Sequence, residues 1–402
     1  MGNLMLKYDV EKMYTVGFIS ILLRLLFSYS DIIQPPGAVD SLLLGVFVVC
    51  MLLVLIEEEL TRFQIFAVVA LGVLCAYSYT KMDNYYLLVT YFCMAASKGI
   101  NLNYVLGWSY KVRATVLTVH VAAYIFTLIT NPESIEYVYR YGVLRHSFFM
   151  SHANTFSMFL IWTIFEYLYV NYEKLNVPRL VIVALINATL NYFTLSTTNT
   201  IISVVVLVLI VMEKFIPKWK MGIVRWFVKY AYAILGVFFC LISVYYTQFN
   251  STLLSMYNWL NDFFTGRLIY GAYMYDKYGA TIFGNTLALR DKDYWKGYWF
   301  NGIACDNAYM WHLVSFGLIF LVILSLLFLA VGKNISRKDA IFLSVYSMYA
   351  ITEIYVTNAV FCFSLIVLAQ YAFNIDYKEK FQLRLYIQEP TEEGADGRGG
   401  LS

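Results

Sequence analysis

Long apolar stretches separated by short polar turns make up most of this 402-residue chain. A stretch of about 20 apolar residues crosses the hydrocarbon core of a bilayer as a helix, because a backbone in lipid must satisfy its own hydrogen bonds. The pattern predicts helical spans at roughly residues 13–30, 38–56, 63–80, 84–101, 112–130, 153–171, 179–197, 199–213, 227–247, 307–331, 340–356 and 357–374. We therefore expect an all-α polytopic integral membrane protein with about twelve transmembrane helices.

Two polar segments interrupt this pattern. The longer one covers roughly 248–306, and the shorter one, at roughly 131–152, precedes the sixth span. The first part of the longer segment, Leu253 to Phe264, has amphipathic spacing and predicts a helix lying in the membrane interface. Residues 1–374 are thus expected to form a single helical membrane domain, and the polar, glycine-rich segment 375–402 a disordered cytoplasmic tail.

The composition indicates a membrane protein rather than a soluble one. Hydrophobic residues make up 60% of the chain and charged residues 14%, with a mean hydropathy of +0.64. The net charge of +3 is distributed over the turns rather than gathered in a basic patch, and no nucleic-acid partner is expected. Of the six cysteines only Cys305 lies in a polar segment, so the sequence offers no disulfide framework and no zinc spacing, and we expect no metal.

Lysine and arginine are distributed unevenly over the turns. With the N-terminus inside, about sixteen basic residues fall on the inner side, Arg113 among them, whereas about three fall in short outer loops. Those three are Lys81, Arg140 and Arg145. Because basic residues are retained on the cytoplasmic side, we expect both termini in the cytoplasm and both long polar segments outside.

Few ionisable residues lie within the predicted spans, where a buried charge is costly. Arg24 and Glu166 lie near helix ends, from which long side chains reach the interface. Glu353 lies near the outer end of the 340–356 span, where it would face an external site. All six prolines fall in loops or at helix ends, whereas transporters often bind substrate beside broken helices at the midplane. The pattern favours a site at the outer interface.

A polar stripe follows the seventh span. Asn187, Asn191, Thr194 and Thr198 recur at helical spacing and face other helices. Hydrogen bonds between helices explain the stripe as well as a substrate groove does.

The shorter outer segment ends in residues that suit an anionic substrate. It contains Arg140, Arg145, His152 and Asn154. The fixed fork of donors on arginine suits phosphate oxygens, and a histidine is a general base or a donor to a phosphate or sugar hydroxyl. Anchoring at the membrane interface explains this segment equally well.

The longer outer segment carries further candidates. Arg267 follows a glycine, and Arg290 lies further along the segment. The aromatic run 294–300 includes Trp295 and Trp299, which would either stack on sugar rings or belong to the aromatic belt at the membrane surface.

The end of the longer segment places a carboxylate directly before the tenth span. Asp306 and Asn307 stand at this position. A carboxylate at a helix N-terminus is a good cap. The alternative is that Asp306 accepts a proton from a sugar hydroxyl.

In these two outer segments the chain resembles the Wzy-type polymerases of O-antigen, capsule and exopolysaccharide repeat units, and the related O-antigen ligases. Those proteins have many spans and one large external loop in the second half. Their external arginines are matched by Arg145, in an Arg-x6-His-x-Asn run that ends at Asn154, and by Arg267, in a Gly-Arg pair. The ligase signature of histidine and a polar residue, nine residues, and then Gly-x-x-(Gly, Thr or Tyr) has a counterpart from Asp306 to Phe320.

This sequence also departs from the family pattern. Asp306 stands where the ligases carry histidine, which favours polymerase over ligase, and Phe320 departs from the last position of the signature. The residues 196–199, Ser-Thr-Thr-Asn, stand where many relatives have a serine-arginine pair, so a third phosphate contact is missing. The resemblance covers nearly the whole chain in layout, through short motifs.

The resemblance implies a glycosyltransferase-C-like helical fold, with an external cavity capped by the long loop between spans nine and ten. It implies an inverting glycosyltransferase of the bacterial plasma membrane, without metal or cofactor, that moves a growing glycan from undecaprenyl diphosphate to the terminal sugar of another lipid-linked repeat unit. Arg145 and Arg267 would stabilise the departing diphosphate, and Asp306, with His152, would deprotonate the acceptor. Further candidates for substrate contact are Arg140, Asn154, Arg290, Trp295, Trp299, Asn307 and Glu353.

The expected partners are the undecaprenyl-diphosphate-linked oligosaccharide, membrane lipid, a chain-length regulator and a flippase. Two other functions stay open. An O-antigen-type ligase would transfer the glycan to a different acceptor and share nearly every feature. A lipid-linked oligosaccharide flippase has a similar number of spans, but should carry charged residues inside them.

Overall fold

The computed structural model describes residues 2–82, 85–135, 137–140, 142–216, 221–245, 251–264, 266–288, 292–295, 298–301, 305–331 and 335–374. Its α-helices are α1 (Gly2–Ser28), α2 (Gly37–Glu57), α3 (Arg62–Met82), α4 (Tyr86–Ala95), α5 (Leu102–Thr130), α6 (Ala153–Val170), α7 (Val177–Thr194), α8 (Thr197–Phe215), α9 (Gly222–Val244), α10 (Ser251–Phe263), α11 (Arg267–Tyr278), α12 (Ala308–Trp311), α13 (Leu318–Val331), α14 (Arg337–Tyr349) and α15 (Ser364–Phe373). Short 3-10 turns are η1 (Pro132–Ser134), η2 (Tyr172–Lys174) and η5 (Ile354–Thr357), and η4 (His312–Phe316) is a π-helical turn. The predicted tail, 375–402, lies outside the described residues.

Six of the described helices are long and apolar enough to cross a membrane: α2, α3, α5, α7, α8 and α9. The helices α4, α13 and α15 are apolar but only 10, 14 and 10 residues long. The protein is therefore an all-α protein with six candidate membrane-spanning helices, and the prediction of twelve spans is wrong. An apolar run shorter than the bilayer is typical of a core or re-entrant segment, and hydropathy alone does not distinguish these from a lipid-facing helix.

The tenth predicted span, 307–331, is broken near its start. Helix α12 passes into the π-turn η4, the chain turns at Gly317, where φ is +90°, and α13 begins at the next residue. Such a φ is accessible mainly to glycine. A β-carbon on Gly317 would lie 2.3 Å from the Ile282 carbonyl oxygen, so the segment that follows α11 packs directly on the break.

The last two predicted spans are separated by a long segment without α-helix, which contains the 3-10 turn η5. Helix α14 ends at Tyr349 and α15 begins only at Ser364, and the residues 350–363 between them are buried or half-buried throughout. Polar side chains satisfy this buried backbone, as a membrane protein requires. Thr90 of α4 donates to the Thr357 carbonyl at 2.7 Å and accepts from the Ala359 amide at 3.0 Å.

Helix α5 begins ten residues earlier than predicted, which changes the place of one arginine. Arg113 was expected in an inner turn, but it lies within α5 and is fully buried. It pairs at 3.1 Å with Glu166 of α6, which is also fully buried rather than reaching the interface. Ser109 donates to the same carboxylate at 2.9 Å, and Arg113 donates to the Val360 carbonyl of the segment 350–363. A charged pair therefore links three elements in the protein interior.

Helix α6 forms the centre of the core. Nearly every residue of this helix is buried, as expected for a helix that is apolar on all sides. It packs against α5, α7, α8 and α14. Trp162 of α6 makes edge-to-face contacts with Phe165, Tyr349 and Phe363, which tie α6 to α14 and to the chain before α15.

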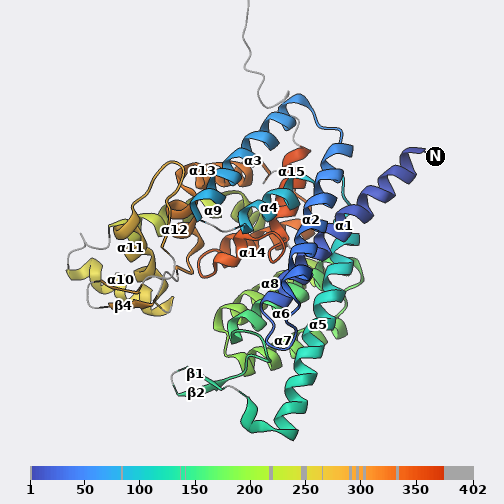
Figure 1. Cartoon of the computed structure of the whole chain (residues 1–402). Coiled ribbons are helices and arrows are strands. Elements are labelled where there is room, and N and C mark those ends of the chain that lie inside the picture. The colour runs from blue at the N-terminus through green and yellow to red at the C-terminus, as the bar shows by residue number, and fades with distance from the viewer. Residues whose placement is uncertain are drawn as a thin grey trace, which may run out of the picture.

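Two β-hairpins, which the sequence did not predict, lie in the two polar segments that were predicted to be external. Strands β1 (Val138–Arg140) and β2 (Val143–Arg145) pair in antiparallel fashion, with Tyr139 opposite Leu144. Strands β3 (Lys292–Trp295) and β4 (Tyr298–Asn301) pair likewise, with Trp295 opposite Tyr298. Figure 1 shows α10, α11 and the β3–β4 hairpin as a lobe beside α12 at one end of the molecule. The lobe corresponds to the longer outer segment.

Candidate functional site

The first residue of α11 is the central residue of the site. Arg267 follows Gly266, which has φ of +85° and ends the short turn after α10. Asn261 of α10 fixes this turn, because its carbonyl accepts from the Gly266 amide at 2.7 Å and its side chain accepts from the Ile269 amide at 3.0 Å. The Gly-Arg pair of the sequence is therefore a helix start that places the guanidinium at the junction of α10 and α11.

Arg267 contacts acceptors from two separate parts of the chain, the segment after α14 and the residue pair before α12. Its Nε donates to the Thr352 carbonyl at 2.8 Å, and its Nη2 donates to Glu353 Oε1 at 3.2 Å. Asp306 Oδ2 lies 3.8 Å from the same Nε. Three residues predicted as separate candidates, Arg267, Asp306 and Glu353, thus form one cluster, which we call the arginine–carboxylate cluster.

The three side chains of this cluster differ in exposure. Those of Arg267 and Glu353 are 12% and 8% exposed, whereas that of Asp306 is 43% exposed. Burial, followed by the charge of Asp306, raises the pKa of Glu353 to about 8. Partial burial also raises the pKa of Asp306, against the opposing effect of Arg267. The Arg267 guanidinium therefore lies beside two carboxyl groups, and that of Asp306 is the one accessible to a ligand.

Asn307 caps the helix that Asp306 precedes. Its side chain accepts from the Met310 amide at 3.0 Å and donates to the Ile351 carbonyl at 3.1 Å. The capping alternative therefore applies to Asn307 and not to Asp306, whose carboxylate is turned to Arg267. Asn307 is also a second link between the start of α12 and the segment that carries Glu353.

A second group of predicted residues gathers at the start of α6. Arg145, the last residue of β2, is only 4% exposed and donates from Nε to the Thr194 carbonyl at 2.8 Å and from Nη2 to Asn154 Oδ1 at 2.5 Å. His152 is exposed and caps α6, with its Nδ1 accepting from the Asn154 amide at 3.1 Å. Arg145 thus joins the β1–β2 hairpin to the ends of α6 and α7.

Tyr355 lies between the two groups, and sequence reasoning missed it. Its hydroxyl lies near the side chain of Thr155, which follows Asn154 in α6. Burial, together with the nearby charges of Glu353 and Asp306, raises the pKa of Tyr355 well above its ordinary value. The only sequence signal for this position is that Tyr355 lies two residues after Glu353.

Two residues of the predicted polar stripe, Asn187 and Asn191, form hydrogen bonds between helices, whereas Thr194 bonds within α7 and Thr198 lies in α8. Asn187 donates to Ser203 of α8 at 2.7 Å, Asn191 donates to Asn187 at 2.8 Å, and Ser157 of α6 donates to Asn191. Asn199 of α8 extends the network to Tyr349 of α14, whose hydroxyl donates to it at 2.7 Å. These residues are engaged in helix packing behind the site.

The aromatic run is described only in part. Trp295 donates from its indole nitrogen to Asp276 at 2.7 Å and contacts the ring of Tyr273 edge-on, so it packs on α11. Tyr294 remains exposed. The side chains of Arg140 and Trp299, and the whole of Arg290, lie outside the described residues.

The arginine–carboxylate cluster has a defined chemical capacity. A partly open carboxylate beside a guanidinium can accept a proton while the guanidinium binds an anion. An anion at Arg267 would compete with Glu353, and protonation of Glu353 lowers that competition. Among the residues that the structure describes, no three His, Cys, Asp or Glu side chains form a group that could hold a metal ion.

No protein-family model matches this chain, and no curated protein and no solved structure shows significant similarity to it.

Proposed function

We propose that this chain is a membrane glycosyltransferase that polymerises lipid-linked glycan repeat units on the outer face of the bacterial plasma membrane. The donor is a glycan on undecaprenyl diphosphate, and the acceptor is the terminal sugar of another lipid-linked repeat unit. The arginine–carboxylate cluster is the single observation that carries the proposal. The contacts within that cluster join the longer outer segment to the buried segment 350–363.

The reaction is a displacement at the anomeric carbon of the donor. The acceptor hydroxyl oxygen forms the new bond to that carbon as the bond to the diphosphate breaks, and undecaprenyl diphosphate leaves with the electron pair. The proton of the hydroxyl passes to Asp306, which is the exposed carboxylate of the cluster. Arg267 stabilises the negative charge on the leaving diphosphate. Direct displacement inverts the anomeric configuration.

The other cluster members position these two groups. Glu353 and the Thr352 carbonyl fix the orientation of the Arg267 guanidinium. Arg145 is nearly fully buried and donates hydrogen bonds to Thr194 and Asn154, so we propose that it positions the start of α6. His152 is exposed at the same helix start, and we propose that it donates a hydrogen bond to the substrate.

A glycan ladder tests the proposal. Cells lacking the gene are compared with wild-type cells by gel electrophoresis of their surface and lipid-linked glycans. A polymerase predicts glycans limited to a single repeat in the deletion strain. Accumulation of finished lipid-linked polymer would instead identify a ligase, which the same cluster would also serve.

One observation favours a flippase as the second candidate. The pair of Arg113 and Glu166 is fully buried, and it contacts the buried segment 350–363. Buried charges beside broken helices are typical of transporters. A flippase predicts that single lipid-linked units accumulate on the cytoplasmic side in the deletion strain.

A further inference from the structure

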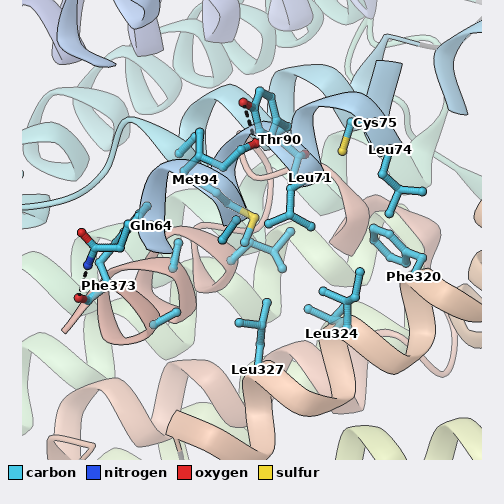
Figure 2. Close-up of a pocket in the computed structure, with 18 of the residues that line it drawn as sticks. Gln64, Leu71, Leu74, Cys75, Thr90, Met94, Phe320, Leu324, Leu327 and Phe373 are labelled. Carbon is cyan, nitrogen blue, oxygen red and sulfur yellow. Dashed lines mark hydrogen bonds between the residues drawn. The ribbon is translucent and has the colours of Figure 1, made fainter. Parts of the chain in front are cut away.

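A long apolar groove lies between α3 and α13, with α4 and α15 forming its floor. It consists of two adjacent cavities of about 150 and 730 Å³ that share lining residues on α3 and α13. The shared residues are Phe63, Ala67, Leu71, Leu74, Ile323 and Leu327. Figure 2 shows Leu71 and Leu74 of α3 facing Leu324 and Leu327 of α13 across this space. We call it the α3–α13 groove.

The groove follows α3 over most of its length. Its lining extends along this helix from Phe63 to Tyr77. At 1.5 Å per residue this distance is about 21 Å, which is roughly two-thirds of the hydrocarbon thickness of a bilayer. The groove is therefore long enough to hold a hydrocarbon chain over about two-thirds of the bilayer core.

The residues of α3 explain why a space remains between α3 and α13. Gly72 allows α3 to approach α4 closely, because a β-carbon there would lie 2.7 Å from the Tyr91 hydroxyl. Tyr91 in turn donates to the Val68 carbonyl at 3.1 Å. The face of α3 turned to α13 carries the small residues Ala67 and Ala70, which leave room between the two helices.

The polar groups in the groove wall are engaged with the protein. The Gln64 amide donates to the Phe373 carbonyl at 2.9 Å, and Thr90 is bonded to the Thr357 carbonyl. An apolar cavity of this kind excludes water and favours hydrocarbon. The chemistry of the wall therefore selects a chain without polar groups.

The surroundings of the groove are those of a membrane lipid. Helix α3 is a candidate membrane span, and Phe66 and Val69, which do not line the groove, are exposed apolar residues. On α13, Leu318, Val322 and Leu326 are likewise exposed. A groove between two helices that present such faces opens to the hydrocarbon of the bilayer rather than to water.

The outer mouth of the groove carries a positive charge. Tyr77 contacts Phe283 edge-on, and the Lys81 ammonium lies 5.5 Å from the centre of the Tyr77 ring. The neighbouring Thr281 and Ile282 carbonyls accept from the first amides of α13 at 2.9 and 3.2 Å. This mouth is therefore formed by the chain that leaves α11, the helix that begins with Arg267.

We propose that the α3–α13 groove binds the isoprenoid chain of the acceptor, a polyprenyl diphosphate whose own head group lies at the outer mouth beside Lys81, while the donor diphosphate lies at Arg267, at the other end of α11. The identity of the chain rests on the proposed function, because a polyprenyl diphosphate has one hydrocarbon chain for one groove and an anionic head group for Lys81. A phospholipid has two acyl chains and is the alternative that the experiment must exclude.

The experiment uses the full-length protein in nanodiscs of neutral phosphatidylcholine. The probe is a polyprenyl diphosphate with a photoreactive diazirine in its chain, and the labelled peptides are mapped by mass spectrometry. We expect labelling on the groove faces of α3 and α13, displaced by unlabelled polyprenyl diphosphate. Equal labelling of all exposed helices, or equal displacement by phosphatidylglycerol, would overturn the proposal.

Two matched substitutions on α3 sharpen the test. Ala67→Trp fills the groove and should reduce labelling by roughly tenfold, because an indole overfills the narrow space. Val69→Trp, on the exposed face of the same helix (58% exposed), should leave labelling unchanged. Leu327→Trp on the opposite wall serves if Ala67→Trp does not fold, and labelling that survives groove filling would contradict the proposal.

The labelling experiment requires no glycan synthesis. A negative result for the groove can therefore be distinguished from a negative result for the polymerase function. A normal glycan ladder in the deletion strain would remove the polymerase function while the labelling still decides the groove. Lys81→Gln adds a second readout. It should weaken displacement by polyprenyl diphosphate but not by uncharged polyprenol, and equal effects on both would remove Lys81 from the head-group site.

Discussion

The Glu353 carboxylate lies 3.2 Å from the Arg267 guanidinium, although 86 residues separate the two in sequence. The contact joins the first turn of the α11 lobe to the buried segment between α14 and α15. It also holds Arg267 beside Asp306. The proposed roles of Arg267 and Asp306 depend on this contact.

Replacing Arg267 by alanine should abolish polymer formation while the protein remains folded in the membrane. The loss of one donor to a developing anion typically reduces turnover by about 10²–10³-fold. Arg267→Lys should also be strongly impaired, because a point charge cannot reproduce the fork that contacts Thr352 and Glu353. Glycan ladders and membrane-fraction immunoblots measure both effects, and normal ladders from Arg267→Ala would exclude this residue from the mechanism.

The pH dependence of donor binding should report Glu353. Its pKa is about 8, so the group is mostly neutral at pH 7 and becomes an anion above about pH 8. The anion competes with the diphosphate for Arg267, and the KM for the donor should rise with pH above about 8 in the wild type. Glu353→Gln should remove this rise. A rise that persists in the variant would assign the titration to another group.

The raised pKa of Glu353 also affects the stability of the fold. The effect of pH has the opposite sign to that of an ordinary salt-bridged carboxylate, whose pKa is lowered by folding. The folded chain holds a proton on Glu353 between the ordinary pKa of 4.5 and about 8, whereas the unfolded chain releases it. The free energy of unfolding should therefore fall as pH rises through this interval. Denaturation of the wild type and of Glu353→Gln in detergent at several pH values measures the difference, and parallel pH profiles would contradict it.

Replacing only one partner of the buried pair of Arg113 and Glu166 should lower the free energy of unfolding strongly. Arg113→Met or Glu166→Leu alone should destabilise the protein by about 3–5 kcal/mol, because each leaves an uncompensated buried charge. The double variant should recover much of that loss. Chemical denaturation in detergent tests this cycle, and additive effects of the two substitutions would show that the charges do not interact.

Gly317 should tolerate no side chain. Alanine there would adopt an unfavourable φ of +90° and place its β-carbon 2.3 Å from the Ile282 carbonyl, so Gly317→Ala should cost more than about 2 kcal/mol. Gly45→Ala in α2, where a β-carbon meets nothing within 4 Å, is the control and should be neutral. Thermal unfolding compares the two variants, and equal melting temperatures would refute the packing argument at the helix break.

The sequence indicated the all-α class correctly, but it was less informative about where the helices begin and end. Hydropathy identified the apolar helices, because a long run such as that of α2 has no other stable conformation in lipid. It overcounted spans because the breaks at Gly317 and in 350–363 depend on hydrogen bonds from distant residues. Thr90, for example, satisfies backbone groups more than 260 positions away.

In the candidate site, too, the sequence indicated residue types but not their contacts. Arg267, Asp306 and Glu353 were each singled out for chemical type and predicted side, but their contact depends on how the α11 lobe packs on the segment after α14. Tyr355 was missed because nothing in the sequence distinguishes a tyrosine packed in an apolar run from one whose hydroxyl lies beside the carboxyl groups of the site. Arg113 was misplaced because a helix that begins ten residues early buries a charge that otherwise fits the positive-inside rule.

The central claim is that Asp306 is the base of a glycan polymerase, and complementation of a deletion strain tests it most directly. The strain receives the wild-type gene, Asp306→Asn or Asp262→Asn, the last removing an exposed carboxylate of α10 in the same outer segment. The account predicts a full ladder of glycan lengths with wild type and with Asp262→Asn, and single repeats with Asp306→Asn at equal protein levels. A full ladder from Asp306→Asn would contradict it.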